Sequence, residues 1–426
     1  MVAVLFISLI IFMALGVPIA VSIGFATLAS MISAGSGNLF MVAQKMVTAM
    51  DATTLLAIPL FILAGAIMGK GGISKRIIDL SYELFGWIPG SLGIVCVVSC
   101  MFFAALSGSS PATVAAIGGI MVPAMIDDGY PAGFSCSVAA AGGIIGCIIP
   151  PSIPFVNYGL ITGESVGDLF AGGILPGILM GVALCVLVSI KSKKNGWGTT
   201  TKGINLWNLL NAFVRSILAL LMPVIILGGI YGGFFTPTEA AAVACIYGII
   251  VACFIYRTVK IKDLYAIGFD AALTAAMIMF IVGTANAFSN IVTTQQVPAK
   301  LTSIIQGVTD SSIVVLLLIN IILLINGCFM EETATTFIYT PILYPLICSY
   351  GVDPVQFGVI MVMNMTMGLI TPPLGINLFV AAGIDKRGTF RDELKYIWPL
   401  FGVLVIVLML VTYIPDISMT LVKLLH

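Results

Sequence analysis

Two stretches of this chain carry helix-breaking residues in the same order. The interval that separates Pro123 from Pro345 recurs between several other pairs: Gly129 and Gly351, Gly146 and Gly368, Pro150-Pro151 and Pro372-Pro373, Ala112-Thr113 and Ala334-Thr335, and Ile120 and Ile342. Because proline and glycine decide where a helix can break, breaks in a common register indicate a duplicated fold. Taken singly, each motif also fits a close-packed turn or an ordinary helix kink.

The composition places these breaks in a membrane. Hydrophobic residues make up 60% of the 426 residues and charged residues 8%, whereas a soluble domain has about 25% charged residues. A chain of this length has room for about ten spans of about 20 residues. The net charge of zero argues against a nucleic-acid partner, and the single histidine, His426, excludes a histidine-based catalytic or metal site.

Other functional classes are also disfavoured. The nine cysteines form no CxxC pattern and are expected to be small buried apolar residues. No Ser–Lys or Asp–Asp set typical of an intramembrane hydrolase is present, so we expect no enzymatic activity and no organic cofactor. Proton-conducting subunits need several acids, lysines or histidines within their spans, and this chain has almost none.

Several apolar segments are expected to be broken within the membrane. Residues 91–105 and 111–125 are each too short to cross about 30 Å of hydrocarbon, so they predict a re-entrant hairpin with its tip at 107–110. The other segments that the pattern predicts are a single first span at 2–34, a second span at 52–68 entered through a polar turn around Gln44, Lys45 and Asp51, a span at 131–162 interrupted at Pro150-Pro151, a second hairpin with arms at 312–326 and 333–347, and a span at 356–384 interrupted at Pro372-Pro373. The predicted fold class is an all-α polytopic membrane protein with two repeats, each containing a re-entrant hairpin and a discontinuous helix.

Basic residues favour one orientation of these segments. With the amino terminus in the cytoplasm, all but three of the 18 lysines and arginines fall in cytoplasmic loops, the exceptions being Lys45, Lys300 and Lys423. An unpaired span at 211–231 then turns the second repeat over and leaves the carboxyl terminus in the periplasm. Inverted repeats of this kind are typical of secondary transporters. The expected organisation is a first repeat at 1–190 (scaffold spans 1–90, hairpin and broken helix 91–190), a cytoplasmic linker and unpaired span at 191–231, and a second repeat at 232–426 (scaffold spans 232–300, hairpin and broken helix 301–426).

The broken segments predict a site for a small cation. Non-helical backbone is tolerated in hydrocarbon only where protein or a watery cavity surrounds it, because unpaired backbone groups are costly there. Carbonyl groups freed around 146–151 and 368–373 offer neutral oxygen ligands, which suit Na⁺. Hydroxyl groups that can complete the ion's shell are those of Ser107, Ser109, Ser110, Thr333 and Thr371.

The same segments predict a site for an anion. Ser110-Pro111 and Thr371-Pro372 have the pattern of a helix N-cap followed by a proline in the first turn. Because the amino terminus of a half-helix carries partial positive charge, a carboxylate is expected between the two tips. Na⁺ would organise the tips, and the organised tips would bind the acid.

The acids and amides near the breaks leave alternatives open. Glu331 and Glu332 lie in the second tip, where acids are functional by default, although one of them can instead face the aqueous mouth. Glu239 belongs to a capping box at 236–239. For Asn157 and Asn377 a role in the pocket and a role in joining helices are equally open.

The sequence resembles the large membrane subunit of tripartite ATP-independent periplasmic (TRAP) transporters, the DctM-type family, along essentially its whole length. The motifs that carry the resemblance are SGSSPAT at 107–113, PAMIDDGYP at 123–131, IIPPSIPFVNYG at 148–159, GGFFTPTEAAA at 232–242 and GLITPPLGINLFVAAG at 368–383. The second tip departs from the family pattern, because GCFMEETAT at 327–335 has two acids where many members have one acid followed by a proline. Glu331 occupies the usual acid position.

The resemblance implies an elevator-type, Na⁺-coupled transporter in which the hairpins and broken helices move against a scaffold. The implied first ion site comprises Ser107, Ser109, Gly146, Ile149 and Pro151, and the second comprises Glu331, Thr333, Gly368, Thr371 and Pro373. Contacts with the substrate are expected from Ser110, Thr113, Ser152, Asn157, Glu332, Thr335 and Asn377.

The resemblance also implies partners. These are a small four-span membrane subunit, expected as a separate chain, and a periplasmic protein that delivers an organic acid in the bacterial inner membrane. A sialic acid-type sugar acid and a C4-dicarboxylate both fit the hydroxyl-rich tips. A stand-alone Na⁺/dicarboxylate symporter that needs no binding protein is the alternative.

Overall fold

The fold is helical throughout its described part. A computed structural model of the chain describes residues 1–35, 39–198, 203, 205–372 and 375–426. Every regular element among them is a helix, and seven helical segments are long and apolar enough to cross a membrane. The predicted all-α polytopic class is therefore confirmed. Pro373 and residues 199–202 of the expected linker lie outside the described residues.

The helices alternate between long spans and short pieces. Those of the first half are α1 (Val2–Ala14), α2 (Ile19–Ser33), α3 (Leu39–Met50), α4 (Ala57–Lys70), α5 (Ile73–Phe85), α6 (Ser91–Ser107), α7 (Ser110–Thr113), α8 (Gly119–Asp127), α9 (Ala132–Gly143), α10 (Ile153–Thr162) and α11 (Val166–Asn195). Those that follow are α12 (Leu206–Tyr231), α13 (Pro237–Ile249), α14 (Asp263–Thr294), α15 (Val297–Gln306), α16 (Ser312–Gly327), α17 (Glu332–Ser349), α18 (Pro354–Gly368), α19 (Ile376–Ala382), α20 (Phe390–Tyr413) and α21 (Asp416–Leu425). Short 3₁₀ turns lie at Thr53–Leu56 and Ile144–Cys147, and π-helical turns at Val114–Gly118 and Ile250–Ile255.

Both hairpins and both interrupted helices are present where the sequence predicts them. Helix α6 has 17 residues and α16 has 16, which at 1.5 Å per residue is about 25 Å and short of a full hydrocarbon crossing. The first interruption separates α9 and its 3₁₀ turn from α10, and the second separates α18 from α19. Pro150-Pro151 lies within the first interruption, and Pro372 lies within the second.

Equivalent helices of the two halves make equivalent contacts. The first arm of each hairpin packs on the first part of its own interrupted helix, α6 on α9 and α16 on α18. The second part of each interrupted helix packs across the molecule on the other hairpin, α10 on α17 and α19 on α7. The long helix after each interruption also crosses over, because α11 contacts α18 and α20 contacts α9. The four broken elements therefore interlock at the centre.

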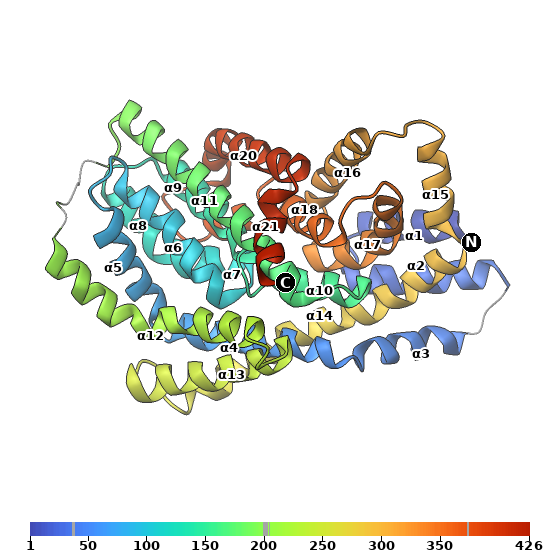
Figure 1. Ribbon diagram of the computed structural model, residues 1–426, viewed down its shortest axis with the longest axis horizontal. Coiled ribbons are helices and arrows are strands. Elements are labelled where there is room, and N and C mark those ends of the chain that lie inside the picture. Colours follow the sequence, from blue (N-terminus) through green and yellow to red (C-terminus); the bar gives the residue numbers. More distant parts are fainter. Residues whose placement is uncertain (36–38, 199–202, 204, 373–374) are drawn as a thin grey trace.

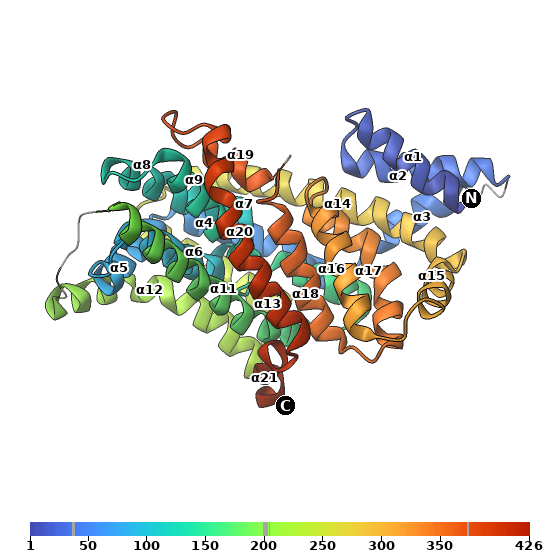
Figure 2. The same ribbon diagram turned by 90° about the horizontal axis from the view of Figure 1, so that it is seen from above.

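Several of the remaining helices flank this centre on one side. Figure 1 shows α3, α4, α12, α13 and α14 along one long side of the molecule, with the hairpins and interrupted helices above them. Helix α14 is the longest, with 32 residues, and contacts α2, α3, α4 and α17. In Figure 2 the pair α1–α2 projects from one corner, while α20 runs across the middle of the molecule.

Three expectations about the periphery are wrong. The expected single span at 2–34 is two helices, because Gly16 adopts a left-handed conformation (φ 77°) and Pro18 starts α2. The chain reverses there, and the hydroxyl of Ser30 donates to the carbonyl of Met1 (3.0 Å). The expected polar turn around residues 44–51 is mostly helix α3, and the expected linker from residue 191 begins inside α11.

Local capping agrees with the sequence at the start of α13. The hydroxyl of Thr236 accepts from the amide of Glu239 (3.3 Å), and the carboxylate of Glu239 accepts from the amide of Thr236 (2.8 Å). This reciprocal pair is the predicted capping box. The carboxylate of Glu239 is thus used within its own helix.

A buried amide network joins the second hairpin to its neighbours. The Asn364 amide donates to the side-chain oxygen of Asn320 (2.7 Å), and the Asn320 amide donates to the hydroxyl of Thr412 (3.0 Å). These three side chains come from α18, α16 and α20 and are at most 1% exposed. The network therefore fixes the register of three helices that the apolar contacts alone would allow to slide.

We expect Asn320→Leu to lower the stability of the purified protein by about 1–3 kcal/mol, because it leaves the buried Asn364 amide and Thr412 hydroxyl without their partner. Thermal unfolding in detergent measures this loss. The matched control is Asn286→Leu, on an exposed position of α14, which should leave the midpoint nearly unchanged. An equal shift in both variants would contradict the role of the network.

Candidate functional site

The tip of the first hairpin is a tight turn held by hydroxyl groups. Gly108 adopts a left-handed conformation (φ 61°), which ends α6 and turns the chain. The Ser107 and Thr113 hydroxyls are 2.8 Å apart, and Thr113 also donates to the carbonyl of Ser109 (2.8 Å). The structure makes Ser109, not Ser110, the residue before the helix, so the predicted N-cap is displaced by one position.

The first interruption packs directly against this tip. A Cβ on Gly146 would lie 2.9 Å from the carbonyl oxygen of Ser109, and a Cβ on Gly108 would lie 2.8 Å from the carbonyl oxygen of Pro151. Among the described residues, no hydrogen bond reaches the carbonyl oxygens of Ile149 and Pro151. Main-chain oxygens of the tip and of the interruption are therefore gathered in one place.

The second tip is organised by its own carboxylate. Glu331 caps α17, since its side chain accepts from the amides of Thr333 (2.9 Å) and Ala334 (3.2 Å) and from the Thr333 hydroxyl (2.8 Å). An acid at a helix amino terminus is stabilised by the helix dipole. The partial positive charge that could attract a substrate at α17 is thus already occupied by the chain.

The second interruption approaches the second hairpin backbone to backbone. A Cβ on Gly368 would lie 2.4 Å from main-chain carbon atoms of Gly327, so only glycine allows this contact. The hydroxyl of Thr371 donates to the carbonyl of Met367 (2.8 Å). Helix α19 begins only after Gly375, so Thr371 does not have the predicted N-cap position.

A polar chain of side chains connects all four broken elements. The Cys147 thiol in the first interruption lies 3.4 Å from Oε1 of Glu332 in the second tip, and it accepts from the amide of Ser110 in the first tip (3.1 Å). The hydroxyl of Ser110 in turn accepts from the side-chain amide of Asn377 on α19 (2.6 Å). The same side-chain amide also donates to the carbonyl of Ala140 (3.2 Å). These five residues make the tips and interruptions one unit.

A cavity of about 760 Å³ lies between this unit and the flanking helices. The two tips line one wall, and α4 and α14 line the opposite wall. Its polar and charged lining residues are Lys70, Ser107, Ser109, Asp270, Thr274, Glu331, Glu332 and Thr333. The cavity is large enough for a small organic acid, and it is reached by side chains from both tips.

The family model described as "Tripartite ATP-independent periplasmic transporter, DctM component" matches residues 6–417. This chain belongs to that family. The predicted resemblance is therefore confirmed over nearly the full length of the chain.

Similar proteins share both sequence and fold with this DctM-family chain. It is 46% identical to the isethionate TRAP transporter permease protein DctMQ of Oleidesulfovibrio alaskensis over 96% of the chain, and it spans 64% of that relative's length. It is 40% identical to the C4-dicarboxylate TRAP transporter large permease protein DctM of Vibrio cholerae, covering 98% of this chain and 96% of the relative, and 36% identical to the sialic acid TRAP transporter large permease protein SiaM of Vibrio cholerae, covering 96% and 95%. The crystal structure of the Alcanivorax borkumensis YdaH transporter, a protein of unusual topology, has a TM-score of 0.63 at 12% identity, covering 88% of this chain and 87% of that one. That likeness supports the fold.

Of the predicted site residues of this DctM-family chain, some line the cavity and others hold the unit together. Ser107, Ser109, Glu331, Glu332 and Thr333 line it. Three predicted residues make contacts elsewhere: Ser152 caps α10 and donates to the carbonyl of Cys147, Thr335 accepts from Asn326, and Thr113 lies within the first tip. Asn157 is fully buried, and neither of its amide atoms has a hydrogen-bond partner among the described residues. Lys70, Asp270 and Cys147 are not among the predicted residues. Lys70 and Asp270 lie far apart in sequence, which hides their pairing, and Cys147 resembles any other apolar residue of its segment.

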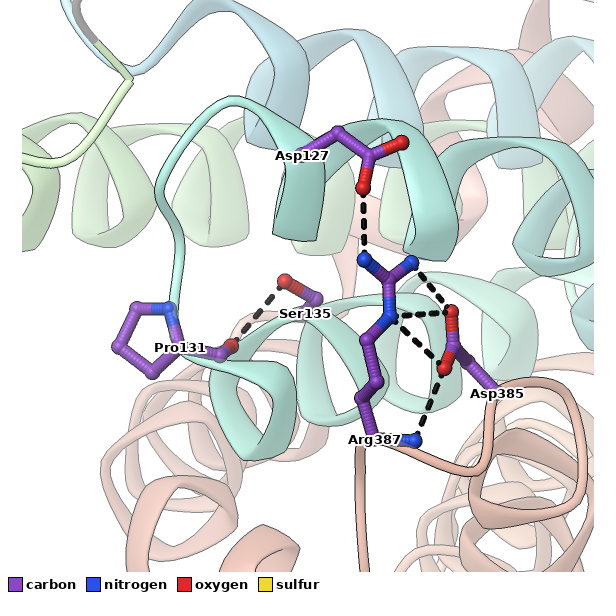
Figure 3. A network of polar contacts seen from close by, with 5 residues as sticks. All are labelled: Asp127, Pro131, Ser135, Asp385 and Arg387. Atoms are coloured by element: carbon purple, nitrogen blue, oxygen red, sulfur yellow. Dashed lines mark hydrogen bonds and ion pairs between the residues drawn. The ribbon is translucent and has the colours of Figure 1, made fainter.

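An ionic contact ties the loop after α19 to the first hairpin. Figure 3 shows the Arg387 guanidinium between Asp127, at the end of α8, and Asp385. The distances are 2.6 Å to each carboxylate. Hydrogen bonds from Arg387 lower the pKa of Asp385 to about 2, so the Asp385–Arg387 ion pair is lost as the pH falls through about 2.

Helix α4 approaches the first tip so closely that its surface has to be glycine. A Cβ on Gly65 would lie 3.1 Å from Cα of Ser107 and 3.3 Å from the carbonyl oxygen of Leu106. On the same face of α4, a Cβ on Gly69 would meet only the Phe103 ring, at an ordinary 3.7 Å. A side chain such as Phe103 can move away from an added Cβ, whereas the main chain of the tip cannot. An alanine should therefore be tolerated at Gly69 but not at Gly65.

We expect Gly65→Ala to slow transport about tenfold, as overpacking of about 1–3 kcal/mol displaces the first tip from α4. Gly69→Ala should stay within about twofold of the unmodified protein. Initial uptake rates in proteoliposomes, at matched protein content, measure both. Equal rates for the two variants would show that the contact of α4 with the tip is not tight during transport.

Proposed function

We propose that this chain is the large permease subunit of a bacterial inner-membrane transporter that imports a small organic acid together with Na⁺. The names of the relatives support an organic acid, since they give isethionate, C4-dicarboxylates and sialic acid as substrates. The convergence of both tips and both interruptions on one cavity is the observation that carries the proposal. Such convergence of broken helices serves polar ligands in membrane transporters.

The oxygen atoms of the first tip and interruption support a Na⁺ site there. The carbonyl oxygens of Ile149 and Pro151 have no hydrogen-bond donor among the described residues, and they lie on the segment that packs on Ser109. Hard cations take oxygen ligands of this type. The proposed first ion site is Ser107, Ser109, Gly146, Ile149 and Pro151, and the proposed second site is Glu331, Thr333, Gly368 and Thr371, with Pro373 as a further ligand outside the described residues.

The acid is proposed to bind between the tips, in the cavity. Since Glu331 occupies the amino terminus of α17, the first tip with Ser109 and Ser110 is left as the anion-binding end. Binding of Na⁺ would fix the Ser107–Thr113 turn and so preorganise that end. Coupling then follows because the acid binds weakly to a tip that no cation has ordered.

Transport is proposed to move the interlocked unit against the flanking helices in an elevator mechanism. The narrow contact of Gly65 with the first tip is compatible with sliding, because it lacks side chains that interdigitate. The two halves are proposed to lie inverted in the membrane, with the amino terminus in the cytoplasm and the carboxyl terminus in the periplasm. The proposed partners are a small membrane subunit and a periplasmic binding protein.

We expect Ser107→Ala to raise the Na⁺ concentration for half-maximal uptake about fivefold, because it removes a hydrogen bond worth about 1 kcal/mol from the ion-binding turn. Thr371→Ala should act in the same direction through the second site. Sodium titrations of uptake in proteoliposomes measure both effects. The matched control is Ser99→Ala on the same helix as Ser107, because the buried Ser99 hydroxyl has no partner among the described residues. Unchanged titrations for Ser107→Ala and Thr371→Ala would contradict the assigned ion sites.

The proposed function itself is tested by reconstitution of both membrane subunits, with a panel of binding proteins loaded with acids. A Na⁺ gradient should drive uptake only when a loaded binding protein is present. Robust uptake by this chain alone would support the stand-alone symporter instead. Uptake that ignores the Na⁺ gradient would overturn the coupling.

A further inference from the structure

The charged side chains around the cavity are dominated by acids. Its charged lining residues are Lys70, Asp270, Glu331 and Glu332. Lys70 is paired with Asp270 (3.3 Å), and no other lysine or arginine among the described residues lines the cavity. Glu331 is held by the amino terminus of α17. The described lining of the cavity therefore holds no unpaired lysine or arginine that could pair with the charged groups of a ligand.

Glu332 is the acid whose bonding is incomplete. It is 9% exposed, and its Oε1 lies 3.4 Å from the Cys147 thiol, a weak donor. Its Oε2 is buried with no hydrogen-bond partner among the described residues, and so is the side-chain oxygen of Asn377 at the other end of the polar chain. Buried acceptors of this kind are costly unless a donor or a cation reaches them.

We propose that Glu332 makes this site selective for singly charged acids that carry hydroxyl groups and discriminates against dicarboxylates. The inference rests on the proposed function. The single anionic group of such a substrate would lie at the first tip, and one of its hydroxyl groups would donate to Oε2 of Glu332. A dicarboxylate would bring a second charge next to Glu332, and the one lysine among the described lining residues, Lys70, is already paired with Asp270.

The atoms around the Glu332 carboxylate differ from those expected around a Na⁺ ligand. A Na⁺ ligand would have to be supported by further oxygens, whereas the described contact of Glu332 is with sulfur. A site built to hydrogen-bond a substrate hydroxyl also rejects analogues that lack it, because the buried acceptor is then left unpaired. Both effects favour the same substrates, and the same side chain causes both.

The test is binding to the purified complex of this chain with its small subunit in saturating NaCl. The probes are radiolabelled 2-hydroxyethanesulfonate and gluconate, which are singly charged and hydroxylated, and succinate. The unmodified complex should bind the hydroxylated acids at least about tenfold more tightly than succinate. In Glu332→Gln the affinity for succinate should rise and that for the hydroxylated acids should fall, so that the preference shrinks about tenfold.

Two further variants make the result specific. Glu239→Gln makes the same chemical change in an exposed capping box, where glutamine is tolerated, and should leave the preference intact. Glu332→Asp keeps the charge but shortens the side chain, so it should still reject succinate while losing affinity for the hydroxylated acids. This second variant also keeps the proposal testable if Glu332→Gln does not fold.

Each alternative outcome contradicts the proposal in a recognisable way. Equal binding of succinate and the hydroxylated acids by the unmodified complex overturns the selectivity and leaves the proposed function standing. A parallel loss of all three acids in Glu332→Gln, rescued by higher Na⁺, would make Glu332 an ion ligand. Absence of binding by any organic acid in the presence of Na⁺ would overturn the proposed function as well.

Discussion

A peptide group that leaves a helix inside hydrocarbon must find its hydrogen bond within the protein. Here the broken segments satisfy one another. The Ser152 hydroxyl donates to the carbonyl of Cys147, the main-chain amide of Ser110 donates to the Cys147 thiol, and the main-chain amide of Asn377 donates to the carbonyl of Leu369. The first and third of these contacts close each interruption on itself, and the second joins the first tip to the first interruption.

Close approach of backbones is the second requirement, and glycine meets it. On α11, Gly173 and Gly177 leave room for the first interruption, since a Cβ there would lie 2.4 Å from the carbonyl oxygen of Ile148 and 2.5 Å from Cγ1 of Ile149. Gly368 meets Gly327 in the same way in the second half. The interruptions are therefore held from outside by smooth helix faces, while the carbonyl oxygen of Pro151 lies beside Gly108 of the first tip.

The parts that the sequence predicts well are those in which one residue decides the backbone. Pro150-Pro151 and Pro372 lie in interruptions, and the Thr236–Glu239 capping box forms as expected. The sequence predicts less where the local residues allow more than one backbone conformation. Gly16 and Pro18 are compatible with a kink in one span and with a turn between two helices, and the structure has the turn. Contacts between distant segments were out of reach altogether. Nothing local marks Cys147 as a link in the polar chain.

The same distinction applies to the candidate site. In the SGSSPAT tip the Ser107 and Thr113 hydroxyls meet, whereas the different contacts of Glu331 and Glu332 depend on where α17 begins. Because α17 starts at Glu332, Glu331 becomes its cap and Glu332 turns toward the first interruption. A shift of one residue in that helix start would exchange the two roles, and no pattern in GCFMEETAT decides it.

The central claim is that both tips and both interruptions together form a site for Na⁺ and an acid. Cryo-electron microscopy of the complex in lipid nanodiscs, in NaCl and in KCl with the same acid, tests it most directly. The account predicts density between the first tip and the carbonyl groups of Ile149 and Pro151 in NaCl, and its loss in KCl together with a loosened Ser107–Thr113 turn. Maps with identical tips and no such density in either salt would contradict it.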